Sequence, residues 1–213
     1  DAVIAFDVGP ANTLIDGVVT FLSDGRERMD RGGERGLRGA VDPELLERLL
    51  DDPFLRRPPP KSTGRERYGS DEAESLAVQS RQSGADEDDL VATLVAFTAE
   101  SVARACRDFL ADPAEVDRLL VGGGGSENPA MMAALRRALP GVAVEPFDAA
   151  GVPAAAAEAM AFALLGRNAL LGIPNHLPRC TGAARATVLG EIVPGGTGCR
   201  WPLTRRERPA SRS

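Results

Sequence analysis

The sequence predicts an α/β fold in which short parallel strands alternate with helices. Residues 2–6 form an apolar run that ends at Asp7, and Gly9 and Pro10 then indicate a turn that opens a helix. The same order of apolar strand, glycine-rich turn and helix returns in the second half of the chain. Because parallel sheets bind ligands at the carboxyl ends of their strands, we expect Asp7 and Gly123 to lie side by side.

The composition is typical of a folded cytoplasmic protein. A chain of 213 residues with 43% hydrophobic content can bury a substantial core, which suggests one domain or one and a half. The net charge is -6 and the basic residues are scattered, so we expect no nucleic-acid partner. We expect neither a membrane span nor a leader, and the three widely separated cysteines indicate reduced thiols.

Two further features set limits on the chemistry and on the extent of the chain. The single histidine, His176, excludes a His-rich metal centre, and we assign no residue as a metal ligand. The chain opens directly on a predicted strand and without a methionine, so we expect that a preceding segment is missing.

The end of the first predicted strand is the first candidate site. Free backbone N–H groups at the start of the following helix favour an anion such as phosphate, which Gly9 would allow close to the main chain. Asp7 would then stand beside the anion as a metal partner or a proton acceptor. The alternative is that Asp7 simply caps the helix.

The first helix is expected over residues 10–22, followed by a solvated loop over residues 23–39. Asp42 and Pro43 predict the start of a second helix that ends at Leu50. The prolines of residues 57–66 exclude a helix there. This segment is either a plain linker or a contact for phosphate or sugar through its polar side chains, which are Lys61, Ser62, Thr63 and Arg65.

An acidic segment, residues 70–89, is expected to be exposed surface, and it leads into the strongest predicted helix. That helix has acidic residues at its start and an apolar face from Leu90 to Phe109. Cys106 lies on this face, so we interpret it as a core residue and not as a nucleophile.

Residues 119–121 predict a strand, and the four glycines that follow would let adenine, ribose or phosphate lie against bare backbone. The alternative is a loop that needs left-handed backbone. Another strand is expected over residues 142–145, a long helix over 153–171, a strand over 187–193 and a disordered basic tail over 197–213. Glu158, inside that helix, faces either water or a cleft.

Four separate blocks resemble one protein family in their order, spacing and residues. They are Phe6-Asp-Val-Gly-Pro-Ala-Asn12 with Leu14-Ile-Asp16, Pro58-Pro-Pro-Lys-Ser-Thr-Gly-Arg-Glu66, Gly122-Gly-Gly-Gly-Ser-Glu-Asn-Pro129, and Glu158-Ala-Met-Ala-Phe-Ala163 with Leu177-Pro178 and Thr181-Gly-Ala183. Over residues 1 to about 196 the chain resembles the C-terminal half of anhydro-N-acetylmuramic acid kinases.

The resemblance implies an actin-like ATPase (ribonuclease H-like) fold, in which residues 1–196 form the C-terminal nucleotide-binding domain of a two-domain kinase. ATP would bind with Mg²⁺ in the cleft between the halves. The enzymes of this family cleave the 1,6-anhydro ring of an amino sugar while phosphorylating it, giving N-acetylmuramic acid 6-phosphate in cell-wall recycling. The resemblance also implies a cytoplasmic enzyme that is a homodimer at full length.

The resemblance assigns roles to residues of the four blocks. Asp7 matches the general base that takes a proton from the water attacking the anomeric carbon, while the ring oxygen attacks the γ-phosphate. Lys61, Arg65 and Glu158 are expected substrate contacts. The expected nucleotide contacts are Gly9 and Asn12 at the phosphates, and Gly122, Gly123, Gly124, Gly125 and Asn128 at the nucleoside end.

The chain departs from the family pattern at several positions. Glu127 stands where the family usually has histidine, Ala11 stands where it usually has glycine, and residues 26–36 are unusually basic. Nothing in the chain resembles the N-terminal half, which carries the other phosphate-binding hairpin and much of the sugar pocket. We therefore expect a fragment, or half of a split gene, that is inactive alone. The alternative is a non-catalytic nucleotide- or sugar-binding remnant.

Overall fold

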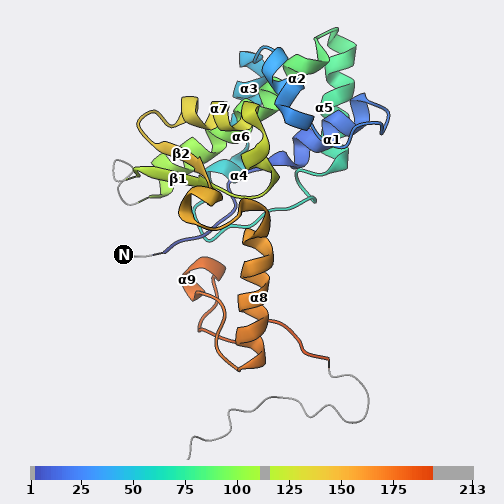
Figure 1. Cartoon of the computed structure of the whole chain (residues 1–213). Helices are drawn as coiled ribbons and strands as arrows, with labels where there is room; N and C mark the ends of the chain where they lie inside the picture. The colour runs from blue at the N-terminus through green and yellow to red at the C-terminus, as the bar shows by residue number, and fades with distance from the viewer. Residues whose placement is uncertain (1–2, 111–115, 194–213) are drawn as a thin grey trace, which may run out of the picture. The chain divides into compact units, whose positions relative to one another are not determined.

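A computed structural model of the chain describes residues 3–110 and 116–193, and these belong to two compact units (Figure 1). The main unit is Phe6–Ala157, and the second unit comprises Asp1–Ala5 and Glu158–Ser213. The predicted tail, residues 197–213, lies outside the described residues. The extent of the predicted domain, residues 1–196, stays a prediction.

Helices dominate the described part of the main unit, which also contains two short strands. In chain order its elements are α1 (Asn12–Leu22), a 3₁₀ turn (Arg31–Gly33), α2 (Glu34–Arg38), α3 (Pro43–Leu50), α4 (Pro53–Arg56), α5 (Ser70–Ser83), α6 (Glu87–Phe109), β1 (Arg118–Val121), a 3₁₀ turn (Gly124–Glu127), α7 (Pro129–Ala138), β2 (Ala143–Pro146) and two more 3₁₀ turns (Phe147–Ala150 and Ala154–Ala156).

The sheet confirms the predicted parallel α/β class. Strands β1 and β2 pair in parallel, with Arg118 opposite Ala143 and Val121 opposite Pro146. The intervening helix α7 packs on β2, as expected for a strand, helix and parallel strand in sequence. Both strands lie within one residue of their predicted bounds.

The strand predicted at residues 2–6 is wrong over the residues that the structure describes. Residues 3–6 are not paired, and Val3 and Ile4 are 60% and 40% exposed. An apolar run becomes a strand only when a neighbour supplies ladder hydrogen bonds, and the described sheet contains β1 and β2 alone. The strand predicted at residues 187–193 is wrong for the same reason.

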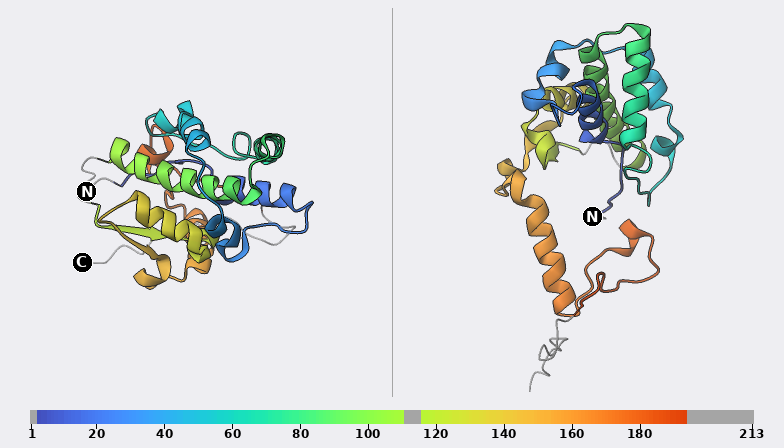
Figure 2. Two further views of the ribbon diagram at one scale, coloured as in Figure 1. Left: turned by 90° about the horizontal axis from the view of Figure 1, so that it is seen from above. Right: turned by 90° about the vertical axis from the view of Figure 1, so that its right-hand side faces the viewer.

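Helix α6 is the centre of the main unit and confirms the strongest predicted helix. It packs against α1, α2, α3, α5 and α7, and Figure 2 shows α6 and α7 side by side. Val91, Leu94 and Phe97 are almost fully buried in it. Cys106 is half-buried on the same helix, and burial raises the pKa of its thiol, which agrees with a packing role.

Helix α5 corrects the prediction that residues 70–89 are an exposed surface segment. Three small or apolar residues, Ala73, Leu76 and Ala77, repeat at helical spacing and are buried against α1. A Cβ on Gly17 of α1 would lie 2.6 Å from the Cβ of Ala73, so glycine lets the two helices approach closely. A narrow face of small residues is thus enough to bury this mostly polar helix.

The segment between α1 and α3 differs in part from the predicted solvated loop, because it contains a short helix. The expected solvated loop over residues 23–39 contains α2, because Asp30 is buried and its carboxylate accepts hydrogen bonds from the N–H groups of Arg35 and Gly36. Helix α3 has the predicted bounds, and Asp42 caps it by accepting from the N–H groups of Glu44 and Leu45. No helix forms over residues 57–66, as predicted.

The second unit contains α8 (Ala157–Leu170) and the single turn α9 (Pro178–Thr181). Helix α8 confirms the long alanine-rich helix, and Gly172 follows it at a φ of 64°. Within the described part of the chain, no helix combines the length and the apolar character that crossing a membrane requires.

Candidate functional site

The Asp7 carboxylate is held by the segment that precedes α5. Its Oδ2 accepts one hydrogen bond from the Ser62 hydroxyl and one from the Thr63 backbone N–H, each 2.8 Å long. The backbone N–H of Asp7 donates to the carbonyl oxygen of Lys61 at 3.2 Å. Asp7 therefore does not cap α1, and two of the blocks that carry the resemblance meet at this carboxylate.

The turn after Asp7 leads directly into α1. Gly9 packs against Ser101, since a Cβ on Gly9 would lie 3.4 Å from the Ser101 Cβ. Ala11 has a φ of 49° and a ψ of -129°, a conformation that glycine adopts more readily. Among the described residues no side chain caps α1, although the N–H of Thr13 donates to the carbonyl oxygen of Pro10 at 3.1 Å. An uncapped helix start favours a nearby anion.

The four glycines after β1 differ in what they do. Gly122 gives room to the Phe147 ring, which a Cβ would approach to 3.1 Å, and Gly123 has a φ of 70°. Gly125 faces α1, where a Cβ would lie 3.6 Å from both terminal atoms of the Asn12 amide. The glycine loop and the start of α1 are therefore adjacent.

Asn128 closes the glycine loop and starts α7. Its Oδ1 accepts hydrogen bonds from the N–H groups of Ala130 and Met131, at 2.9 and 3.1 Å. Gly33 lies against this cap, because a Cβ there would come within 2.4 Å of the Asn128 Oδ1. The capping oxygen is thus in use, and the Nδ2 amide is the part of Asn128 that remains for a ligand.

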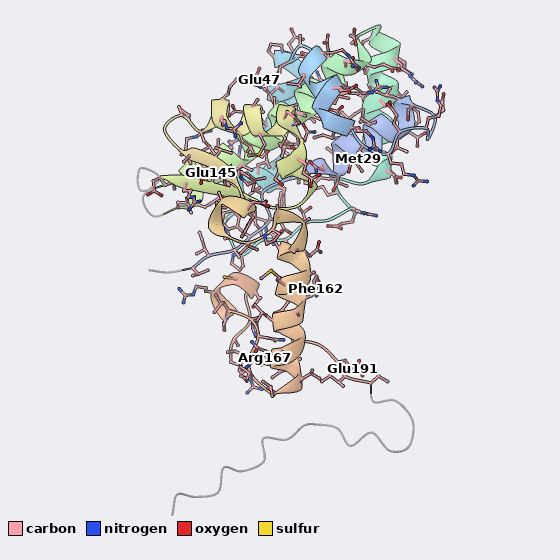
Figure 3. All side chains as sticks on the ribbon, in the orientation of Figure 1. Met29, Glu47, Glu145, Phe162, Arg167 and Glu191 are labelled. Carbon is pink, nitrogen blue, oxygen red and sulfur yellow. The ribbon has the colours of Figure 1, made fainter. Side chains whose placement is uncertain are left out.

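A cavity of about 470 Å³ joins these segments. Its walls come from the start of α1, the loop before α2, and the glycine loop with the start of α7 (Figure 3 labels Met29 on the second of these). Three of its residues are predicted nucleotide contacts, namely Asn12, Gly124 and Asn128. The others are Ile15, Asp16, Met29, Asp30, Arg31, Gly32 and Glu127.

The charges around the cavity are mainly carboxylates. Burial raises the pKa of Asp16 from its ordinary value, and the nearby Asp30 raises it further. Asp30 already uses both oxygens on backbone N–H groups, whereas Asp16 has no side-chain hydrogen bond among the described residues. Asp16 and Glu127 are therefore the carboxylates available to a bound molecule, and Arg31 is a cation among the lining residues.

The expected substrate contacts are not gathered in this cavity. The Lys61 ammonium is buried and donates to the carbonyl oxygens of Phe54 and Leu55, at 3.1 and 3.0 Å, which favours a structural role. Arg65 is exposed on the same segment. Glu158 is exposed in the first turn of α8, in the second unit.

Sequence reasoning missed the loop residues Met29, Asp30, Arg31 and Gly32, because residues 23–39 were interpreted as solvated loop. Two signals were available there, the adjacent glycines 32 and 33 and an aspartate placed to cap the following turn. It also left Asp16 without a role, although Asp16 lies within a block that carries the resemblance.

Comparison with known proteins agrees with the four blocks. The family model described as anhydro-N-acetylmuramic acid kinase matches residues 1–195. A protein of that name from Streptomyces coelicolor is 45% identical over 206 residues, which cover 97% of this chain and 51% of the relative. A second protein of that name, from Gloeobacter violaceus, is 47% identical over 196 residues, which cover 92% of this chain and 50% of the relative. The chain spans about half the length of the curated relatives it matches.

Proposed function

Because the chain belongs to the anhydro-N-acetylmuramic acid kinase family, we propose that it supplies one half of a sugar kinase. In this proposal the main unit is the C-terminal domain of an actin-like, two-domain enzyme. The enzyme transfers the γ-phosphoryl group of ATP to 1,6-anhydro-N-acetylmuramic acid and opens its anhydro ring with water. The observation that carries the proposal is the cavity in which the start of α1 meets the glycine loop.

The cavity suits the nucleoside end of ATP better than its phosphates. Carboxylates repel phosphate but accept hydrogen bonds from ribose hydroxyls and from the amino group of a purine, and Asp16, Asp30 and Glu127 line this cavity. The uncapped start of α1, beyond Asn12, is the neighbouring place where backbone N–H groups would receive the phosphates.

Asp7 is the proposed proton acceptor. It precedes Asn12 by five residues, so their α carbons are at most about 18 Å apart, within one ligand of the size of ATP plus a sugar. Asp7 takes a proton from a water molecule, the water oxygen bonds to the anomeric carbon, and the bond from that carbon to the oxygen of the 1,6-anhydro bridge breaks. The released oxygen receives the phosphoryl group, which yields N-acetylmuramic acid 6-phosphate and ADP.

The residues present are compatible with Mg²⁺ carried by ATP. Among residues 3–110 and 116–193 no group of three or more possible ligand side chains gathers. Mg²⁺ at nucleotide sites needs only one or two carboxylates beside the phosphates and keeps several water ligands, so a cluster of three side chains is not required. When bound, the ion neutralises charge that develops on the phosphates.

The test compares phosphoryl transfer by this chain alone with transfer by the chain combined with the half of a relative that it does not cover. The chain is combined with the N-terminal half of a relative, and formation of the phosphorylated sugar from ATP is measured. We expect product from the combination and none from residues 1–213 alone, for which calorimetry should detect weak or no ATP binding because one wall of the cleft is absent. Micromolar ATP affinity of the chain alone, with no product from the combination, would instead support a self-contained binding module.

A further inference from the structure

We propose that residues 61–63 form a positioning element that fixes the Asp7 carboxylate for proton transfer. Lys61 anchors the segment, and Ser62 and Thr63 hold one carboxylate oxygen. The inference rests on the proposed function of Asp7. It gives the conspicuous lysine of this block a role different from contact with the phosphate or the sugar.

The two donors converge on a single oxygen. The Ser62 hydroxyl and the Thr63 N–H both donate to Oδ2 of Asp7 at 2.8 Å, from positions 55 and 56 residues away in the sequence. Oδ1 accepts no hydrogen bond from the part of the chain that the structure describes. A carboxylate held at one oxygen cannot rotate freely, so the other oxygen keeps a fixed direction toward a reactant.

Lys61 fixes the backbone that carries these donors. Lys61 is 6% exposed, and its ammonium donates to the carbonyl oxygens of Phe54 and Leu55 at the end of α4. The nitrogen also lies 4.7 Å from the ring centroid of Phe54 and 4.8 Å from that of Phe109, at distances typical of cation–π contacts.

The anchor is connected directly to the acid. The carbonyl oxygen of Lys61 accepts a hydrogen bond from the N–H of Asp7 at 3.2 Å, so the Asp7 backbone and side chain both bind this segment. Phe6, the residue before Asp7, packs edge-on against Phe109, one of the rings around the ammonium. Lys61 therefore stabilises both sides of the contact that orients Asp7, although its own charge faces inward.

The first test needs no turnover and uses the full 213-residue chain. Hydrogen exchange of the Thr63 amide is followed by NMR in the parent and in Asp7→Ala, which removes the acceptor. We expect exchange to become at least about tenfold faster in Asp7→Ala, since a local opening that costs 1.4 kcal/mol less is ten times more populated. Lys61→Met, which keeps the apolar stem, should have the same effect, and Glu72→Gln on the exposed face of α5 is the matched control.

The second test separates positioning from binding in the combined two-half enzyme. Ser62 is exposed, so Ser62→Ala should fold normally. We expect it to lower kcat by roughly 10- to 100-fold through loss of orientation, with the KM for ATP within a few-fold of the parent. Ser62→Thr, which keeps the hydroxyl, should restore most of the kcat.

Unchanged Thr63 exchange in Asp7→Ala would overturn the proposed hydrogen bond. A normal kcat in Ser62→Ala would overturn the positioning role of Ser62, and a raised KM with normal kcat would make Ser62 a substrate contact instead. Failure of the proposed function has a different signature, in which the parent combination itself forms no product while the Thr63 amide still depends on Asp7. If Lys61→Met does not fold, Lys61→Arg tests the anchor, and we expect faster Thr63 exchange because the guanidinium is too large for the site.

Discussion

Thr98 on α6 holds the Ala11 peptide by donating a hydrogen bond from Oγ1 to the Ala11 carbonyl oxygen at 3.1 Å. This bond fixes the turn between Asp7 and α1 in a conformation with a φ of 49° at Ala11. The turn therefore keeps a backbone shape suited to glycine, although the residue is alanine.

We expect Ala11→Gly to raise the free energy of unfolding by about 1 kcal/mol. Relief of a left-handed non-glycine residue is worth about 1–3 kcal/mol, and the added freedom of the unfolded chain subtracts about 0.4–1 kcal/mol. Urea denaturation measures the difference. Ala40→Gly, in an exposed loop, is the control and should not stabilise the chain; a lower midpoint for Ala11→Gly than for Ala40→Gly would contradict the strain at Ala11.

The close approach of α1 and α5 predicts that Gly17→Ala destabilises the main unit. The new Cβ would lie 2.6 Å from that of Ala73, so the helices must move apart, at a cost of about 1–3 kcal/mol. Adding Ala73→Gly to Gly17→Ala should recover part of the loss. Gly166 in α8 has no atom within 4 Å of an added Cβ, so Gly166→Ala should cause no loss in thermal unfolding. An equally stable Gly17→Ala variant would disprove this packing.

Asp52 predicts a pH-dependent contribution to stability. Burial alone would raise the pKa of its carboxyl, but hydrogen bonds from Arg67, the Phe54 N–H and Tyr68 outweigh burial and hold the pKa below its ordinary 3.8. Because the folded pKa is lower than the unfolded one, the stabilisation is complete above about pH 4 and is lost as the pH falls through the folded value.

We therefore expect Asp52→Asn to cost about 2 kcal/mol at neutral pH and clearly less near pH 3. Urea denaturation of both proteins over this pH range measures the difference. Asp71→Asn, on the exposed start of α5, should show little loss at any pH. A loss in Asp52→Asn that does not change with pH would mean that the carboxylate charge is not what stabilises this contact.

Local signals in the sequence were sufficient for several elements. Asp42 and Pro43 define the start of α3 through a side-chain cap and a fixed φ, and both act within one turn of the helix. The apolar repeat from Leu90 onward predicts α6 because one face of that helix is buried along most of its length. The parallel pairing of β1 and β2 follows from the helix between them.

Elements that depend on a distant partner were not predictable in this way. Residues 3–6 have the apolar run of a strand but no partner among the described residues, and α5 depends on a glycine 56 positions before Ala73. For the candidate site, Asn12 and the glycine loop were predicted to contact one nucleotide, and Gly124 and Asn128 line one cavity with Asn12. The contribution of Asp30 and its neighbours was missed because their loop has no periodic pattern.

The most direct test of the account is the effect of Asp7→Asn on turnover by the chain combined with the N-terminal half of a relative. The amide keeps the shape of the side chain but removes the proton acceptor, so kcat should fall by about 10²–10⁴-fold. ATP affinity, measured by calorimetry on the same combination, should stay within a few-fold of the parent, and Glu72→Gln should leave both quantities unchanged. Turnover of Asp7→Asn within a few-fold of the parent would show that Asp7 is not the base.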